Sequence, residues 1–161
     1  MSKHRWLGLL LIPGILLVSG CGGEAVTFNN SIAKVTKSLE TMGKSFGETI
    51  AKEKDPGRLQ AAHNDLIAKV KALVAEANAI KVPASQEAQA YWSAFQIYLK
   101  NQEKMVTEDF KEVVAIMGNP TPDMGRLQGV FGRIGQVENN DLAGLKSAQA
   151  AFAKANGMTL K

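Results

Sequence analysis

The sequence is poor in the side chains that most often bind metals. Among its 161 residues there are one cysteine, Cys21, and two histidines, His4 and His63. A single cysteine cannot form a disulfide within the chain, and the absence of a Cys-x-x-Cys-His sequence excludes covalently attached haem. No Glu-x-x-His pair is present for a di-iron helical bundle. A zinc centre needs several clustered ligands, so this composition argues against one.

The chain also lacks long apolar runs and blocks of one charge. Its main apolar stretch, Trp6 to Val18, is shorter than the about 20 residues that a membrane-spanning helix needs. The net charge of +4 includes Lys3 and Arg5, and no basic block follows them. We therefore expect no nucleic-acid partner. Runs of β-branched residues are missing, and helix-forming Ala, Lys, Glu, Gln and Leu dominate, which predicts an all-α protein.

The N-terminal residues follow the order of a secretory signal peptide. Lys3 and Arg5 precede the apolar stretch, and the small residues Ser19 and Gly20 come directly after it. Val18-Ser19-Gly20-Cys21 resembles the lipobox of bacterial lipoproteins, in which an aliphatic residue and two small residues precede a cysteine. This resemblance implies a diacylglycerol on the Cys21 sulfur and cleavage between Gly20 and Cys21. It divides the chain into a signal peptide (1–20), a lipidated cysteine with its tether (21–27) and a helical bundle (28–157).

The same resemblance implies a location in the bacterial cell envelope. Two or three acyl chains at Cys21 are enough for stable anchoring. Gly22 stands where an aspartate would resemble the inner-membrane retention signal of enterobacterial lipoproteins, which favours the outer membrane, facing the periplasm. The alternative is an ordinary secreted protein with a stray cysteine at the cleavage site. Its free thiol would be a liability in an oxidising compartment.

Apolar residues recur every three or four positions in four segments, which predicts four amphipathic helices. We expect these at about 28–50, 58–80, 86–117 and 124–156, with a kink at Asn139 to Asp141. Thr27, Ser85 and Asp123 are suitable N-caps, and Gly157 suits the position after the last helix. Short connections favour an antiparallel up-down four-helix bundle. Alternatively, the first and third helices could form a coiled coil between chains.

Few residues are candidates for ligand binding. His63 could be an axial ligand to haem or copper with Met42 or Met105 opposite, or a histidine at the edge of the core with one nitrogen in water. Gln102 interrupts an apolar stripe, so we expect it to be buried with a partner such as His63. Four aromatic residues lie within two turns and could form a ligand pocket, a contact with lipid headgroups or, more often, core; they are Tyr91, Trp92, Phe95 and Tyr98.

Glycines are unusually frequent in the expected fourth helix, where each costs about 1 kcal/mol relative to alanine. They are Gly125, Gly129, Gly132, Gly135 and Gly144, and the first helix contains Gly43 and Gly47. One interpretation is an unusually close crossing of the first and fourth helices. The other is a loosely packed fourth helix that is soft at its end.

No serine has a base and an orienting group recognisable in sequence, so we expect a non-enzymatic protein without a cofactor. The favoured function is a periplasmic binding or structural module that acts on another envelope protein. The alternative is a carrier that holds haem or another small molecule inside the bundle.

Overall fold

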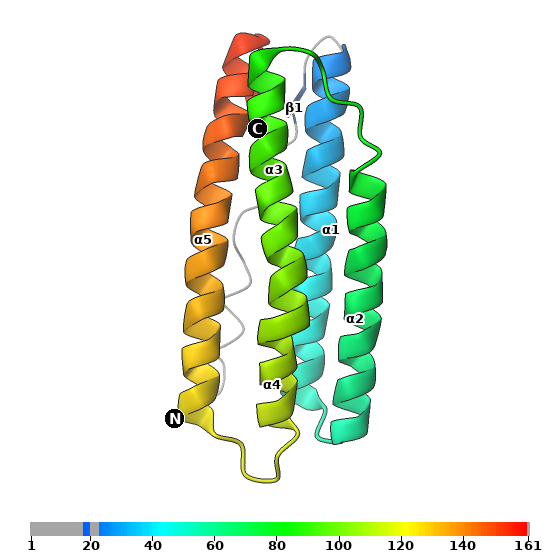
Figure 1. Ribbon diagram of the computed structural model, residues 1–161, viewed down its shortest axis with the longest axis vertical. Coiled ribbons are helices and arrows are strands. Elements are labelled where there is room, and N and C mark those ends of the chain that lie inside the picture. Colours follow the sequence, from blue (N-terminus) through cyan, green and yellow to red (C-terminus); the bar gives the residue numbers. More distant parts are fainter. Residues whose placement is uncertain (1–17, 20–22, 161) are drawn as a thin grey trace.

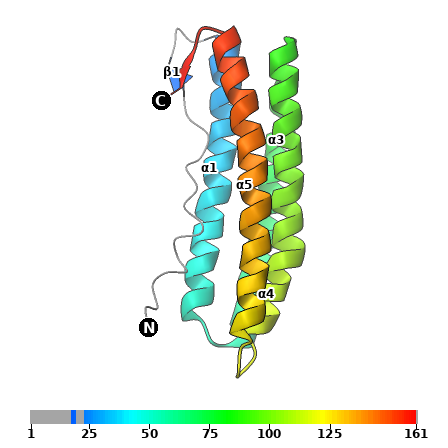
Figure 2. The same cartoon turned by 90° about the vertical axis from the view of Figure 1, so that its left-hand side faces the viewer.

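The structure, a computed structural model, describes residues 18–19 and 23–160, and it is an all-α helical bundle. Its long helices lie side by side with their axes aligned (Figures 1 and 2). The elements in chain order are β1 (Val18–Ser19), α1 (Glu24–Lys52), α2 (Pro56–Ala77), α3 (Gln86–Lys104), the π-helix η2 (Met105–Asp109), α4 (Phe110–Met117), α5 (Met124–Ala155) and β2 (Thr159–Leu160).

The connections lie at the two ends of the bundle. Figure 1 shows α1 beginning and α5 ending at the same end, where the connection between α2 and α3 also lies. The turn at Asp55 and the loop 118–123 lie at the opposite end. The two short strands pair antiparallel, with Val18 opposite Leu160 and Ser19 opposite Thr159. This pairing brings the C-terminal residues to the end of the bundle at which α1 starts.

Most helix boundaries are set by capping side chains. Ser85 accepts a hydrogen bond from the Ala88 amide, and Asp123 accepts one from the Arg126 amide, so two of the three expected N-caps are confirmed. Gly157 comes after α5 with φ +62°, as its position beyond a helix end requires.

Three expectations about the helix ends and course are wrong. Helix α1 begins at Glu24, so residues 24–27 are helical and the tether is shorter than predicted. The Thr27 hydroxyl bonds back to the Gly23 carbonyl at 3.4 Å, a contact made inside the helix, not a cap. Helix α2 ends at Ala77, not Ile80. Helix α5 continues through Asn139 to Asp141 without a break, and Asp141 accepts two contacts from the Asn101 side chain of α3 at 2.9 and 3.0 Å.

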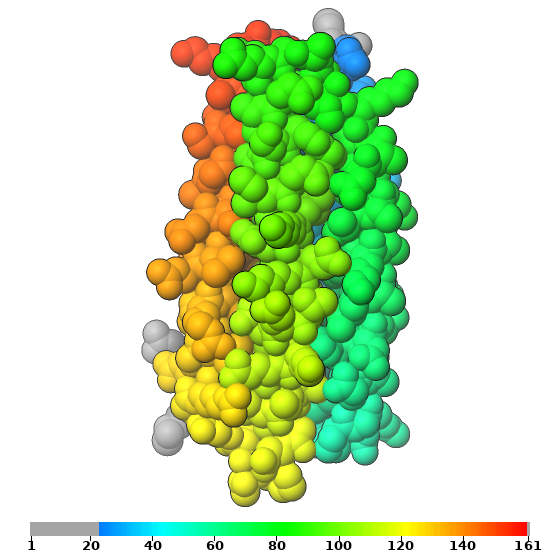
Figure 3. All heavy atoms as spheres, viewed as in Figure 1, coloured from blue at the N-terminus to red at the C-terminus, as the bar shows by residue number. Residues whose placement is uncertain are grey.

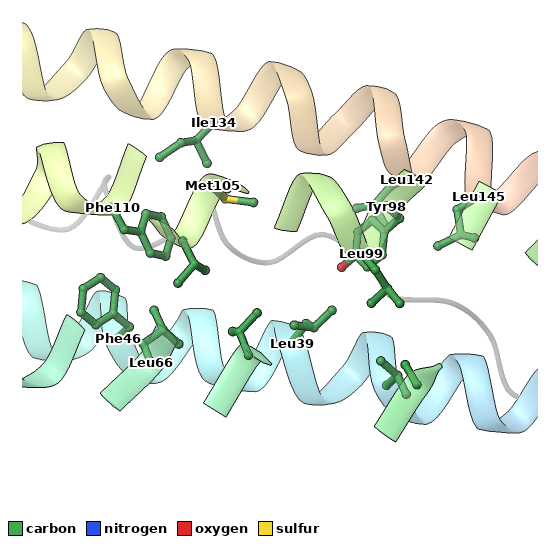
Figure 4. Packing of buried hydrophobic residues seen from close by; sticks show 14 of the residues in the cluster. Leu39, Phe46, Leu66, Tyr98, Leu99, Met105, Phe110, Ile134, Leu142 and Leu145 are labelled. Atoms are coloured by element: carbon green, nitrogen blue, oxygen red, sulfur yellow. The ribbon is translucent and has the colours of Figure 1, made fainter. Parts of the chain in front are cut away.

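The core runs the length of the bundle and combines residues of every long helix. Figure 4 shows Phe46 of α1 and Leu66 of α2 facing Met105 and Phe110, with Ile134 of α5 on the far side. On the face shown in Figure 3, α3 and α4 fill the space between α2 and α5. The expected aromatic core is confirmed, since Tyr91, Phe95 and Tyr98 are buried and Trp92 packs against the core as a partly buried side chain.

A buried polar cluster lies within the core near the start of α1. The Asn29 side-chain oxygen accepts hydrogen bonds from Gln149 of α5 at 2.8 Å and from the Tyr91 hydroxyl of α3 at 3.4 Å. All three side chains are buried. Rings of Phe28 and Phe152 pack beside them with centroids 5.4 Å apart. Because these hydrogen bonds form in only one alignment, the cluster fixes the relative heights of α1, α3 and α5.

The glycines do not mark a close crossing of α1 and α5. A Cβ built at Gly43, Gly129 or Gly132 would meet no atom within 4 Å. Helix α5 packs most extensively against α3, and α1 packs most extensively against α2. The close-packing hypothesis is therefore wrong, and open space surrounds these positions.

This open space leads to a prediction. Replacing Gly129 by alanine should raise the free energy of unfolding by about 0.5–1 kcal/mol, because alanine restricts the unfolded chain and adds no clash. Urea denaturation of the two proteins measures the difference. Gly157→Ala is the matched control, and it should destabilise because φ is +62° there. A loss of stability in Gly129→Ala would show that something occupies the space beside α5.

Candidate functional site

The predicted lipid-attachment site lies outside the described residues, which include neither Gly20 nor Cys21. The nearest described helix is α1, which starts at Glu24. Only Gly22 and Gly23 therefore separate Cys21 from the first helical residue. Any group attached to Cys21 is therefore only three residues in sequence from the start of α1.

His63 is deeply buried, so the expectation that one of its nitrogens reaches water is wrong. Its side chain is 2% exposed, and Nε2 lies 2.7 Å from the Val106 carbonyl oxygen. A carbonyl only accepts, so Nε2 carries a hydrogen and donates it. Nδ1 is buried with no partner among the described residues. His63, one of the partners suggested for Gln102, therefore does not bond to it.

The acceptor of the His63 hydrogen bond belongs to η2, a single π-helical turn between α3 and α4. Within it the Phe110 amide bonds to the Met105 carbonyl, five residues earlier. Such turns interrupt α-helices rarely and often occur at functional sites. This turn also buries both Met105 and Val106, which are neighbours in sequence. The sequence does not reveal this π-helical turn, because the apolar residues of 86–117 follow a single α-helical pattern.

A cavity of about 30 Å³ lies beside this π-helical turn, in the middle of the bundle. All of the long helices contribute to its wall. Its lining is mostly apolar but includes three polar side chains, and it consists of Leu39, Glu40, Met42, Gly43, Leu66, Val70, Gln102, Met105, Val106, Phe110 and Glu138. The volume is enough for one or two water molecules.

Two polar atoms of this cavity have no hydrogen-bond partner among the described residues. They are Nε2 of Gln102 and Oε2 of Glu138, and both are buried. The Gln102 side chain is only 7% exposed. Buried polar groups without a partner are costly and rare. Gln102 is thus buried as expected, but no group in the described part of the chain accepts from its amide nitrogen.

The cavity has a negative electrostatic character. Burial raises the pKa of Glu138, and the negative charges of Glu40 and Asp141 raise it further. Burial, followed by the charges of Glu138, Glu40 and Asp141, also raises the pKa of the Tyr98 hydroxyl. Among residues 23–160, neither Glu40 nor Glu138 forms an ion pair with a lysine or arginine. Their charge is therefore not compensated by the described part of the protein.

Sequence reasoning missed Glu138, although a signal was present. The apolar stripe of the expected fourth helix includes Val137, but that side chain is 44% exposed. Glu138 lies four residues after Ile134 and four before Leu142, both of which are buried. Its spacing places it on the inner face, although its charge suggests the outer one.

The proposed pairing of His63 with a methionine does not form a ligand site in this structure. Met42 and Met105 line the cavity, but His63 does not, and its Nε2 is engaged by Val106. Ligand pockets of the usual size measure about 300–1,000 Å³, at least tenfold more than the 30 Å³ of this cavity. The cavity can hold an ion or water molecules, and haem does not fit in it.

Comparison of the chain with protein-family models, with curated proteins and with solved structures finds no match. In the part of the chain that the structure describes, no helix has both the length and the apolarity to cross a membrane. The observations that bear on function are therefore the N-terminal sequence and the geometry of the bundle.

Proposed function

We propose that this protein is a bacterial envelope lipoprotein, anchored through Cys21 and facing the periplasm from the outer membrane. The observation that carries the proposal is the register of its first 21 residues, in which charge, apolar core, small residues and cysteine come in the required order. The early start of α1 supports it, since a helix that begins at Glu24 brings the bundle directly to the anchor.

We further propose that the mature domain is an antiparallel up-down four-helix bundle acting as a non-enzymatic binding or structural module. The positions of the connections at alternate ends support this topology (Figure 1). Cleavage before Cys21 removes β1, so β2 loses its partner in the mature protein. The 29 residues of α1 span about 44 Å, which sets how far from its membrane an upright bundle can meet another envelope protein.

The anchor is tested by replacing Cys21 with serine. We expect the variant to remain an unprocessed or mislocalised precursor, because a hydroxyl does not accept the diacylglycerol as the thiol does. Mass spectrometry of the N-terminus and detergent partitioning measure the outcome. Ser19→Ala is the matched control, since it keeps a small residue beside the cleavage site and should be processed normally. A Cys21→Ser protein that begins at residue 21 and partitions into detergent like the wild type would contradict the proposal.

A further inference from the structure

The central cavity combines features that a plain core lacks. Gln102 of α3 and Glu138 of α5 both line it with buried polar atoms that have no partner among the described residues. Glu40 of α1 lies in the same wall. Folding has therefore gathered two carboxylates and an amide around a space large enough for a small polar occupant.

A carboxylate elsewhere in the bundle has cationic partners. Glu112 of α4 accepts hydrogen bonds from Arg126 at 2.8 Å and from Arg133 at 2.9 Å. No described cation pairs in this way with Glu40 or Glu138. An occupant with positive charge would supply the missing compensation, because two carboxylates that face one cavity repel each other.

We propose that this cavity is a binding site for one small, hard divalent cation of the Ca²⁺ or Mn²⁺ class, held by Glu40, Glu138 and Gln102. Oxygen ligands suit such cations, and two carboxylates match a double charge. The Gln102 amide supplies its oxygen after a half-turn of its terminal group, whose oxygen and nitrogen have nearly the same shape. The remaining ligands are one or two water molecules, as the 30 Å³ volume allows.

The size and composition of the cavity narrow the choice of ion. Mg²⁺ usually keeps several of its waters, and this cavity does not have room for them. No three His, Cys, Asp or Glu side chains within residues 23–160 are grouped as metal ligands, so the affinity is modest. We expect a dissociation constant on the order of 0.1–1 mM, as in extracellular calcium modules. A soft ion would instead choose the sulfurs of Met42 and Met105, which line the same cavity.

Gly43 leaves open space in the wall of the site. It lies in the cavity wall on α1, and a Cβ at this position would meet no atom within 4 Å. Ion binding in the cavity does not depend on the lipid anchor, so failure of the ion-binding test leaves the lipoprotein proposal intact, and the reverse also holds.

The test is a terbium titration of the full protein as cells produce it, kept in detergent. Tb³⁺ prefers oxygen ligands. Beyond burial, the charges of Glu138 and Glu40 raise the pKa of Tyr98, so this tyrosine lies near the site and can sensitise Tb³⁺ emission. We expect saturable emission with one ion per chain, displaced by Ca²⁺. Glu138→Gln should weaken binding at least about tenfold, because one of two charged ligands is lost. Glu108→Gln, the matched control, removes the same charge from an exposed side chain and should bind like the wild type.

Thermal unfolding provides a second readout that reports on folding. Without added ions, Glu138→Gln should melt at or above the wild-type temperature, because it removes a half-buried charge next to Glu40. Added Ca²⁺ should raise the melting temperature of the wild type and of Glu108→Gln, but not that of Glu138→Gln. Absence of saturable emission, or equal affinity in Glu138→Gln and Glu108→Gln, would overturn the inference. The inference would also be overturned if the protein bound Ag⁺, a soft ion, and lost this binding in Met42→Leu, while Tb³⁺ emission stayed weak in all of the proteins.

Discussion

Replacing Phe152 by alanine is expected to lower the free energy of unfolding by about 3–5 kcal/mol, the cost of removing a fully buried aromatic side chain. Phe152 of α5 is 0% exposed. Its ring lies 5.4 Å from that of Phe28 and 5.7 Å from that of Tyr91, so one side chain joins three helices. Since single domains are stable by about 5–15 kcal/mol, this loss is a large part of the total. Guanidinium denaturation monitored by circular dichroism measures it.

The control for this experiment is Ile97→Ala in α3. Ile97 is a large apolar residue that is 59% exposed, and its removal should change stability by less than about 0.5 kcal/mol. If both variants lost similar amounts of stability, the assignment of Phe152 to the core, and with it the position of the C-terminal part of α5, would be contradicted.

Replacing Asn29 by leucine should cost about 2–4 kcal/mol, although leucine has a similar size and is more apolar. The substitution removes the acceptor for the Gln149 amide and for the Tyr91 hydroxyl, both of which are buried. A buried donor that loses its partner costs about 1–3 kcal/mol. Chemical denaturation measures the loss.

A double-mutant cycle separates this mechanism from simple steric misfit. In the Asn29→Leu background, Tyr91→Phe removes one of the donors that has lost its acceptor, so it should recover stability. In the wild-type background the same change should destabilise by about 1 kcal/mol, because it breaks the hydrogen bond to Asn29. A cycle in which Tyr91→Phe costs the same in both backgrounds would show that the Asn29 side chain does not accept from Tyr91.

The sequence predicts the helices well because their apolar stripes and their caps agree. Residues 86–117 are helical throughout, and Ser85 and Asp123 cap the helices that start directly after them. The start of α1 could not be predicted in the same way, since Gly23 makes no side-chain cap and Thr27 resembles one. Apolar character alone would place Val137 inside, but its side chain is 44% exposed, and Glu138, spaced four residues from the buried Ile134 and Leu142, lines the cavity instead.

The candidate cavity could be predicted only in part. Gln102 was recognisable because a polar residue interrupts an apolar stripe, and its burial is confirmed. The partners from other helices were not recognisable, because the relative heights of helices depend on contacts distant in sequence, such as the Asn29–Gln149 hydrogen bond. The spacing of apolar residues predicts that His63 lies near the inner face. The carbonyl that accepts its hydrogen bond belongs to a π-helical turn, which the pattern of apolar residues does not reveal.

The π-helical turn η2 also makes one point of this chain tolerant of a change in length. A turn bonded over five residues holds one residue more than the α-helical turn it replaces, so deleting one residue from 105–109 restores regular bonding. Helices α3 and α4, on either side of the turn, then keep their apolar faces toward the core. Elsewhere in α3, a deletion would rotate the remainder of the helix by about 100° and turn its apolar face away from the core. At η2 the deletion would cost only the hydrogen bond of His63, because the Val106 carbonyl that accepts it would instead accept from a backbone amide of the regular α-helix. Deletion of one residue from 105–109 should therefore leave the bundle folded and cost only the interactions of this turn, above all the hydrogen bond of His63.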